Sequence, residues 1–220
     1  MPRVEEEIKQ DVVDQLAWDD RVNAAEIDVE VHDSTVVLRG SVPSWWARTS
    51  AVEDAESVPG VVLVEDQLTV RWPPVYAPTD TELWDDVDRA LRRNPNVDAS
   101  RISIGVSDGT VSLDGTVDAY WKKLQAERIA SDVTGVLEVE NRLAVVPTSK
   151  ITDERIASDI VGSLKRNALV DEERVDVMVS NGIVTLNGSV PNWATRRAVR
   201  RAAHLTPGVV NVHDNLVVAV

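Results

Sequence analysis

The residues best suited to bind an anion form one short basic segment near the C-terminus. Arg196, Arg197, Arg200 and Arg201 stand at positions i, i+1, i+4 and i+5 of a segment whose apolar spacing predicts a helix. Side chains four residues apart lie on one helix face, so the guanidinium groups share one flank. Guanidinium groups pair well with phosphate and carboxylate. The pattern predicts a site for an anion or an acidic surface, and a solvated helix face is the alternative interpretation.

The other reactive residue types do not assemble a catalytic or metal-binding pattern. The histidines are His32, His204 and His213, and none of them shows a metal-ligand spacing such as H-x3-H. Cysteine is absent from the sequence, which excludes a thiol nucleophile and a disulfide. No serine stands in a nucleophile elbow, and no glycine loop is placed to hold a phosphate. We therefore expect a non-enzymatic protein with no metal and no cofactor.

Charge is distributed unevenly along an acidic chain. The net charge of −14 argues against nucleic acid as the main partner and against attraction of the whole molecule to anionic lipid. Residues 1–72 carry 6 basic and 16 acidic side chains, residues 73–150 carry 9 and 13, and residues 151–220 carry 8 and 8. The acidic first third complements the arginine segment, so head-to-tail association into a homo-oligomer is one prediction.

The start of the chain and the length of its apolar runs indicate where in the cell we expect the protein. The chain begins MPRVEEEIKQ, without the basic and apolar regions of a secretory signal. No run approaches the roughly 20 apolar residues that a transmembrane helix needs. We therefore expect a cytoplasmic protein without a transmembrane segment.

A threefold internal repeat supplies the elements that position these residues. The pattern V-x-L-x-G-x-V occurs in residues 35–42, 110–117 and 183–190, and its glycines are 75 and 73 residues apart. A second glycine follows each of them by 20 residues, and a leucine follows that glycine by 8. The two glycines of each copy are Gly40 and Gly60, Gly115 and Gly135, and Gly188 and Gly208. Such fixed spacing indicates three tandem units.

Each unit reads as helix, strand, strand, helix, strand. Apolar triplets at i, i+4 and i+8, such as Ile8, Val12 and Leu16, predict a first amphipathic helix. An alternating strand then turns into the V-x-L-x-G strand through two residues, of which Asp108-Gly109 and Asn181-Gly182 are strong hairpin signals. Second helices are predicted over residues 44–57, 119–132 and 192–205, and a closing strand follows each.

The predicted fold is α+β, with three tandem αββαβ two-layer sandwiches. In each sandwich, a three-stranded mixed sheet carries two helices on one face, because strand alternation leaves the other face polar. The predicted domains are residues 1–72, 79–147 and 151–220, joined by linkers at 71–80 and 147–152. The first linker is rich in proline, and we expect it to be semi-rigid.

Three positions near the start of the second helices recur at fixed distances from the repeat glycine. The fifth position holds Trp45, Tyr120 and Trp193, the sixth Trp46, Trp121 and Ala194, and the eighth Arg48, Lys123 and Arg196. We expect the fifth to close the end of its own unit's core. The sixth should project outward, to a neighbouring unit, a partner or a headgroup layer. The eighth either covers the core edge with its stem or contacts an anion.

A polar residue also recurs among the apolar positions of the closing strands. These residues are Asp66, Asn141 and Asp214. Burial of an unpaired polar group is costly, so each should make a hydrogen bond or mark a bulge. We interpret this position as structural.

The ordered recurrence of these motifs resembles a known family. The V-x-L-x-G-x-V hairpin, the second helix, a Gly-Val step and a closing (D/N)-x-L-x-V strand are similar to the BON domain, named for OsmY-type osmotic-shock proteins and nodulation proteins. The resemblance covers nearly the whole chain as three tandem copies. It implies an αββαβ fold, no enzymatic activity, and association with phospholipid or membrane surfaces in osmotic or envelope stress. Many members carry a secretion signal or a lipobox cysteine, and this sequence shows neither.

Two functional hypotheses follow. The first is a non-enzymatic binding module whose three units recognise phospholipid headgroups or a protein partner. Its binding residues would be Trp46, Trp121, Arg48, Lys123, Arg196, Arg197, Arg200 and Arg201. The second is a cytoplasmic structural scaffold that self-associates through its domain surfaces without lipid. Co-sedimentation with anionic vesicles separates the two.

Overall fold

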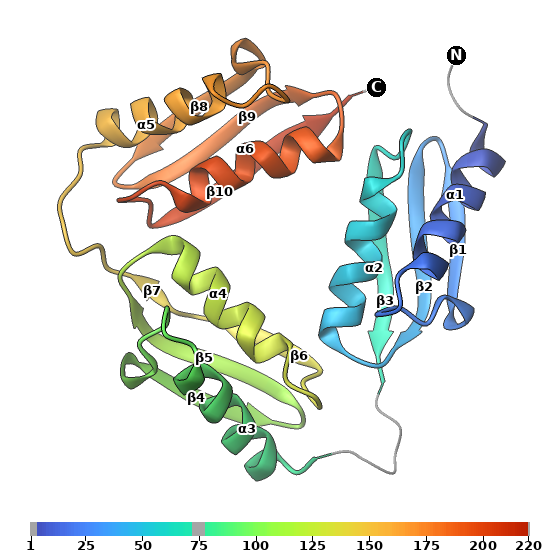
Figure 1. The fold of residues 1–220 in the computed structure, drawn as a ribbon, viewed down its shortest axis with the longest axis horizontal. Coiled ribbons are helices and arrows are strands. Elements are labelled where there is room, and N and C mark those ends of the chain that lie inside the picture. Colours follow the sequence, from blue (N-terminus) through green and yellow to red (C-terminus); the bar gives the residue numbers. More distant parts are fainter. Residues whose placement is uncertain (1–3, 72–77, 220) are drawn as a thin grey trace.

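The structure is a computed structural model that describes residues 4–71 and 78–219, apart from the side chain of residue 172. Most of the proline-rich linker predicted at 71–80 lies outside these residues. The described chain forms three successive units of the same element order (Figure 1). The predicted α+β class and the three repeated αββαβ units are confirmed.

The element bounds follow the repeat closely. Unit 1 contains α1 (Glu5–Trp18), β1 (Ile27–His32), β2 (Thr35–Val42), α2 (Trp45–Ser57) and β3 (Leu63–Val70). Unit 2 contains α3 (Asp80–Arg93), β4 (Ile102–Ser107), β5 (Thr110–Val117), α4 (Tyr120–Ser131), β6 (Glu138–Asn141) and β7 (Ala144–Val145). Unit 3 contains α5 (Asp153–Lys165), β8 (Val175–Ser180), β9 (Ile183–Val190), α6 (Trp193–Leu205) and β10 (Asn211–Val218).

The V-x-L-x-G strand is the central strand of each sheet. In unit 1, β2 pairs antiparallel with β1 and parallel with β3, so the sheet is mixed as predicted. Unit 3 repeats this order with β8, β9 and β10. Unit 2 differs because its closing strand is interrupted, and both β6 and β7 pair parallel with β5. Two helices cover one face of each sheet (Figure 1).

Each unit has its own hydrophobic core. The apolar triplets of the first helices are buried in the described structure, in three separate clusters. Leu38, Leu113 and Leu186 of the central strands lie beneath them at 0% exposure. One residue departs from this separation, because Tyr120 of unit 2 packs against the core of unit 3.

The repeat glycine is required by a close backbone approach. Gly40 has φ +128°, a conformation that side chains rarely adopt, and a Cβ there would lie 2.0 Å from the carbonyl oxygen of Glu26. Gly115 and Gly188 meet the carbonyls of Arg101 and Arg174 in the same way, at 2.1 Å. The motif therefore marks a tight contact between the central strand and the turn before the first strand.

A carboxylate at the start of the first helix ties that helix to the hairpin turn. Asp80 accepts hydrogen bonds from the backbone N–H groups of Asp108 and Gly109, at 3.0 and 3.2 Å. Asp153 accepts from Asn181 and Gly182 at 2.7 and 2.8 Å. The turn residues adopt positive φ, as the hairpin signals predict. The carboxylate that holds them was not identified from the sequence.

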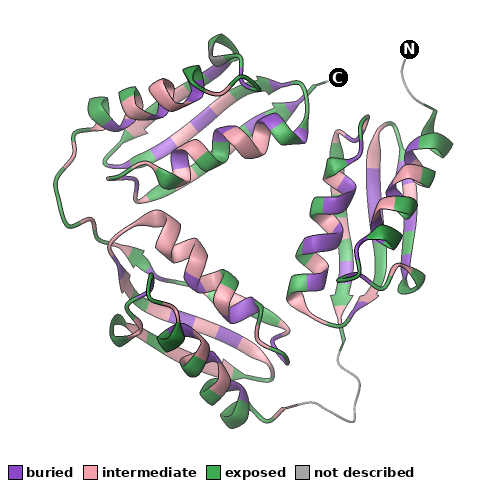
Figure 2. Ribbon diagram, in the orientation of Figure 1, coloured by how far each residue is buried: buried purple, intermediate pink, exposed green. Residues whose placement is uncertain are grey.

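The second helices of the three units face one another around the middle of the molecule (Figure 1). Helix α6 contacts both α4 and α2. Figure 2 shows intermediate burial along most of α4, which fits a helix covered partly by its own sheet and partly by a neighbour. The positions of interest near the start of the second helices therefore lie close to unit boundaries.

Candidate functional site: a groove lined by arginines

A groove of about 480 Å³ lies between α4 of unit 2 and α6 of unit 3. We call it the arginine groove, and its lining is Trp121, Leu124, Gln125, Arg128, Arg197, Arg200, Arg201, His204 and Leu205. Four guanidinium groups thus border a surface that also carries an indole and two leucines. Such a surface can hold an anionic group beside an apolar one.

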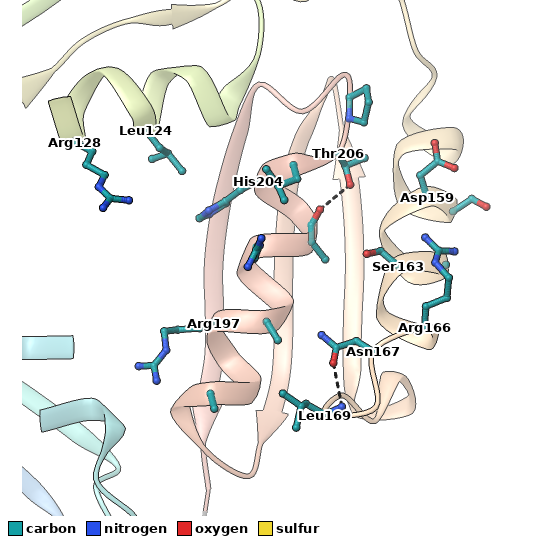
Figure 3. Close-up of a pocket in the computed structure, with 18 of the residues that line it drawn as sticks. Leu124, Arg128, Asp159, Ser163, Arg166, Asn167, Leu169, Arg197, His204 and Thr206 are labelled. Atoms are coloured by element: carbon teal, nitrogen blue, oxygen red, sulfur yellow. Dashed lines mark hydrogen bonds between the residues drawn. The ribbon is translucent and has the colours of Figure 1, made fainter. Parts of the chain in front are cut away.

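A second hollow of about 1380 Å³ extends over α6 toward α5 and shares part of this lining, including Arg201 and Leu205 (Figure 3). In Figure 3, Leu124 and Arg128 come from α4, whereas Asp159, Ser163 and Arg166 belong to α5 on the other side of α6. Helix α6 therefore borders two grooves that join over it. The arginine groove lies on the α4 side, and the second, which we call the α5–α6 groove, lies on the α5 side.

The four arginines predicted from the sequence are not equivalent. Arg196 donates from Nε to Asp214 at 2.9 Å, and Arg200 Nε lies 3.5 Å from the same carboxylate. Arg197 pairs with Glu56 of unit 1 at 3.5 Å. Arg201 is exposed, and among the described residues no ion pair involves it. Arg201 is thus the member of the segment that is most available to an added anion.

The basic residue at the eighth position has a structural partner in units 1 and 3. Arg48 donates from Nε to Asp66 at 2.7 Å, as Arg196 does to Asp214. The other carboxylate oxygen of Asp66 accepts the N–H of Leu68 at 3.0 Å. The helix and the closing strand are therefore pinned together by one aspartate, and the predicted hydrogen-bonding role of this polar position is confirmed.

Unit 2 makes the equivalent link without an ion pair. Asn141 accepts the backbone N–H of Leu143 at 3.2 Å and donates from Nδ2 to the carbonyl of Lys123 at 2.9 Å. Nδ2 also lies 2.9 Å from Glu127 Oε2. Lys123 is half-buried, and it touches this network through its backbone and not through its ammonium.

The aromatic residues at the fifth position divide between two roles. Trp193 is 6% exposed in the core of unit 3, as expected of a residue that closes its own core. For Tyr120 that expectation is wrong: its ring packs against unit 3, with its centroid 5.3 Å from that of His204. The aromatic contact between units 2 and 3 is thus made by Tyr120, the residue at the fifth position of unit 2. The contact of α4 with α6 places Tyr120 there.

The sixth position also differs between units. Trp46 is 36% exposed, and the guanidinium of Arg21 from its own unit lies 5.1 Å from its ring. Trp121 lines the arginine groove, with the ammonium of Lys122 5.6 Å from its ring. The structure therefore brings Trp121 together with Arg197, Arg200 and Arg201, but places Trp46 and Arg48 in unit 1, apart from that groove.

His204 is held in its neutral form beside the groove. Burial is the main cause, and the charge of Arg200 adds to it, so that the pKa of His204 falls to about 4 while Asp214 opposes the shift. Burial also raises the pKa of Tyr120. At neutral pH the aromatic contact between units 2 and 3 therefore pairs two uncharged rings.

Five residues that line the groove were not predicted as site residues from the sequence: Leu124, Gln125, Arg128, His204 and Leu205. Leu124 and Arg128 stand three and seven residues after Trp121 in α4, so the three side chains share one helix face. The spacing of Arg128 from Trp121 was the available signal. It could not be used without knowing that this face meets α6.

Across residues 4–71 and 78–219, no three His, Cys, Asp or Glu side chains gather in a way that could hold a metal ion. None of the helices that the structure describes is long and apolar enough to cross a membrane.

The BON domain family model matches residues 5–71, 79–147 and 152–220, almost the whole chain. The chain belongs to the BON domain family. The resemblance stated from the sequence motifs is confirmed, and each match coincides with one αββαβ unit.

Two curated proteins carry similar sequences. The chain is 26% identical over 143 residues to osmotically-inducible protein Y of Escherichia coli (strain K12). The aligned segment covers 62% of this chain and 71% of that protein. The chain is also 50% identical over 46 residues to an uncharacterized protein in the gshII 5′ region of Anaplasma centrale, which spans 21% of this chain and 30% of that protein.

Among solved structures, one similar chain is CdsD, a structural protein of the type III secretion system of Chlamydia trachomatis. It aligns over 97% of this BON protein and 92% of its own length, with 15% identity and a TM-score of 0.28. A similarity at this level carries no argument about the function of the BON units.

Proposed function

We propose that the three BON units form one non-enzymatic binding module that recognises anionic phospholipid headgroups through the arginine groove. The observation that carries this proposal is the convergence of Arg128 with Arg197, Arg200 and Arg201 from two different units. A phosphate bound there would meet guanidinium groups on both walls.

The apolar side chains of the groove favour a lipid over a free anion. Trp121 and Leu124 lie on the α4 wall, and Leu205, which is 53% exposed, lies on the α6 wall. Indole rings are well suited to the headgroup layer because they combine an apolar body with an N–H donor. Since the chain as a whole carries −14, attraction to a membrane must be local and should weaken as salt rises.

The name of the relative from Escherichia coli suggests when such a module acts. That relative is osmotically inducible. We propose that this BON protein likewise serves under osmotic or envelope stress, as a binder of membrane surfaces.

Vesicle co-sedimentation tests the lipid proposal directly. Vesicles of phosphatidylglycerol and phosphatidylcholine should pellet the protein, and vesicles of phosphatidylcholine alone should not. Arg128→Gln with Arg201→Gln should lower the bound fraction at least about fivefold, because these are the two exposed groove cations for which the described residues show no ion pair. Arg89→Gln, which breaks only the pair with Asp86 on α3, is the matched control. Failure to pellet with anionic vesicles, or equal binding by the double variant, would overturn the proposal.

A second candidate function is a scaffold that self-associates without lipid. The observation that favours it is the pairing of acidic unit 1 with the arginine helix α6 through Glu56 and Arg197. The same attraction that acts within one chain is available between chains. Light scattering with and without vesicles distinguishes this scaffold from the lipid-binding module, since the scaffold gains mass in both cases.

A further inference from the structure

The groove between α5 and α6 is open because unit 3 lacks a tryptophan that units 1 and 2 possess. Ala194 stands at the sixth position, where the other units have Trp46 and Trp121. Ala194 lines this groove together with Ala198 and Leu205 of α6. Ala194 is exposed, so nothing in the described chain covers it.

The residue opposite this position also changes. In unit 1, the indole of Trp46 lies against Arg21, which stands 19 residues before the repeat glycine. The same offset in unit 3 gives Leu169, which is 62% exposed and lines the groove. A large aromatic ring beside a cation is thus replaced by a small residue beside an uncovered leucine. The groove thus exposes Ala194 and Leu169 where unit 1 places the indole of Trp46 against Arg21.

The indole of Trp18 in unit 1 is much more exposed than that of Trp46. It is the last residue of α1 and is 79% exposed, the highest value among the large hydrophobic side chains of the described residues. Exposed Asp14 lies one helical turn before it, and exposed Asp20 follows two residues later. The side chain combines a large apolar area with acidic neighbours, which suits an anchor residue at an interface.

The charges around the groove complement those around Trp18. Arg166 and Arg201 line the groove and are exposed. The acidic residue of the α5 wall, Asp159, is already paired with Arg155 at 2.9 Å. Unit 1 carries 16 acidic and 6 basic side chains over residues 1–72. The net negative charge of the unit therefore adds to the electrostatic attraction between Asp14 or Asp20 and these arginines.

We propose that Trp18 of one molecule inserts into the α5–α6 groove of a second copy of the chain. The contact is head-to-tail, because the donor surface lies on unit 1 and the acceptor on unit 3. Each molecule therefore offers one anchor and one groove, and longer assemblies grow by repetition. This interface rests on the second candidate function and gives that scaffold a defined contact. The arginine groove is a separate proposed site for lipid, although Arg201 and Leu205 line both grooves.

Two single variants test the contact from opposite sides. In sedimentation velocity over a concentration series, the wild-type protein should gain mass as concentration rises and lose it in high salt. Trp18→Ala removes the anchor, and Ala194→Trp fills the groove with the residue native to that position in units 1 and 2. Each should raise the dissociation constant by about tenfold or more. Met178→Ala, which alters an exposed apolar residue of β8, is the control and should associate normally.

Mixing the two variants gives the deciding result. Trp18→Ala retains its groove and Ala194→Trp retains its anchor, so an equimolar mixture should form a one-to-one dimer that cannot grow further. That recovery also shows that both variants are folded. A wild-type protein that stays monomeric, variants that associate normally, or a folded mixture without dimers would each overturn the proposal. If monomeric protein still pellets with anionic vesicles, the lipid-binding function stands and the head-to-tail contact alone is refuted.

Discussion

Glu56 and Arg197 form an ion pair at 3.5 Å although they are 141 positions apart. The pair joins the last turn of α2 in unit 1 to α6 in unit 3. Glu56 is 16% exposed, and burial raises the pKa of its carboxyl, while the charge of Arg197 opposes that shift. The acidic unit and the arginine helix, whose attraction was predicted between molecules, thus also attract each other within one chain.

Removing this charge should loosen unit 1 from unit 3. In Glu56→Gln the carboxylate that faces Arg197 is lost, and the radius of gyration measured by small-angle X-ray scattering should increase. High salt should have the same effect on the wild-type protein. The free energy of unfolding should change by less than about 1 kcal/mol, because Arg197 is partly exposed and the cores are separate.

The matched control for this variant is Glu30→Gln, which breaks the pair with Arg39 inside unit 1 and should leave the scattering unchanged. Exchanging the charges, with Glu56→Arg and Arg197→Glu together, should restore the compact form. Identical scattering from Glu56→Gln and the wild-type protein would show that the ion pair does not hold the units together.

Acid should weaken the contact between units 2 and 3. His204 has a pKa of about 4 in this structure against an ordinary value of 6.5, chiefly because it is buried beside Tyr120. Between pH 6.5 and pH 4 the imidazole therefore binds more protons in the separated or unfolded state, and the contribution of His204 to stability falls as pH decreases. Above pH 6.5 the group contributes no pH dependence. The full loss is at most about 3 kcal/mol.

His204→Phe keeps a ring against Tyr120 and removes the titration. Its stability between pH 6.5 and pH 4, measured by urea unfolding, should fall less steeply than that of the wild-type protein. The charged groups around this site are Arg200, Arg201, Glu127, Arg128 and Asp214, and the variant retains them all. His32→Phe, in β1 of unit 1, is the control. Parallel pH profiles for His204→Phe and the wild-type protein would exclude this role for His204.

The fold of each unit was predictable because its determinants are local. The triplet Ile8, Val12 and Leu16 shows a helical period, and the residues around Gly40 show a strand period, within windows of about ten residues. The carboxylate of Asp80 that binds the hairpin turn was not predictable in the same way. It acts across 28 residues, and nothing in its immediate sequence differs from an ordinary acidic helix start.

The site was predictable only in part, since it depends on how units pack. Arg196 and Arg201 look alike in the sequence, but Asp214 in the closing strand engages Arg196 and leaves Arg201 exposed. Arg128 joins the site from another unit. Tyr120 crosses to unit 3 because α4 lies against α6, and the sequence of either helix alone does not specify that contact.

The repeat glycine should be intolerant of a side chain in any unit, with effects confined to that unit. Gly188→Ala places a Cβ 2.1 Å from the carbonyl oxygen of Arg174 at φ +128°, and should destabilise unit 3 by roughly 2–4 kcal/mol. Hydrogen exchange should show lost protection in the helices and strands of unit 3 only, because the cores are separate. Gly162→Ala in α5, whose nearest contact is Arg166 at 3.4 Å, is the control and should be neutral or stabilising. Uniform loss of protection would contradict the independence of the units.

Neutralising Asp54 should stabilise unit 1 at neutral pH. Asp54 is buried in α2, where burial is the main cause that raises the pKa of its carboxyl to about 6, and Gln15 donates a hydrogen bond to it at 3.2 Å. Since the unfolded state releases this proton near pH 3.8, the contribution of Asp54 to the stability of unit 1 falls as pH rises from 4 to 6. Asp54→Asn keeps the acceptor for Gln15 and can donate to Asp19, so it should gain about 1–3 kcal/mol at pH 7 and nothing below pH 4. Equal stability of the two proteins at pH 7 in urea unfolding would show that the carboxylate of Asp54 carries no such cost.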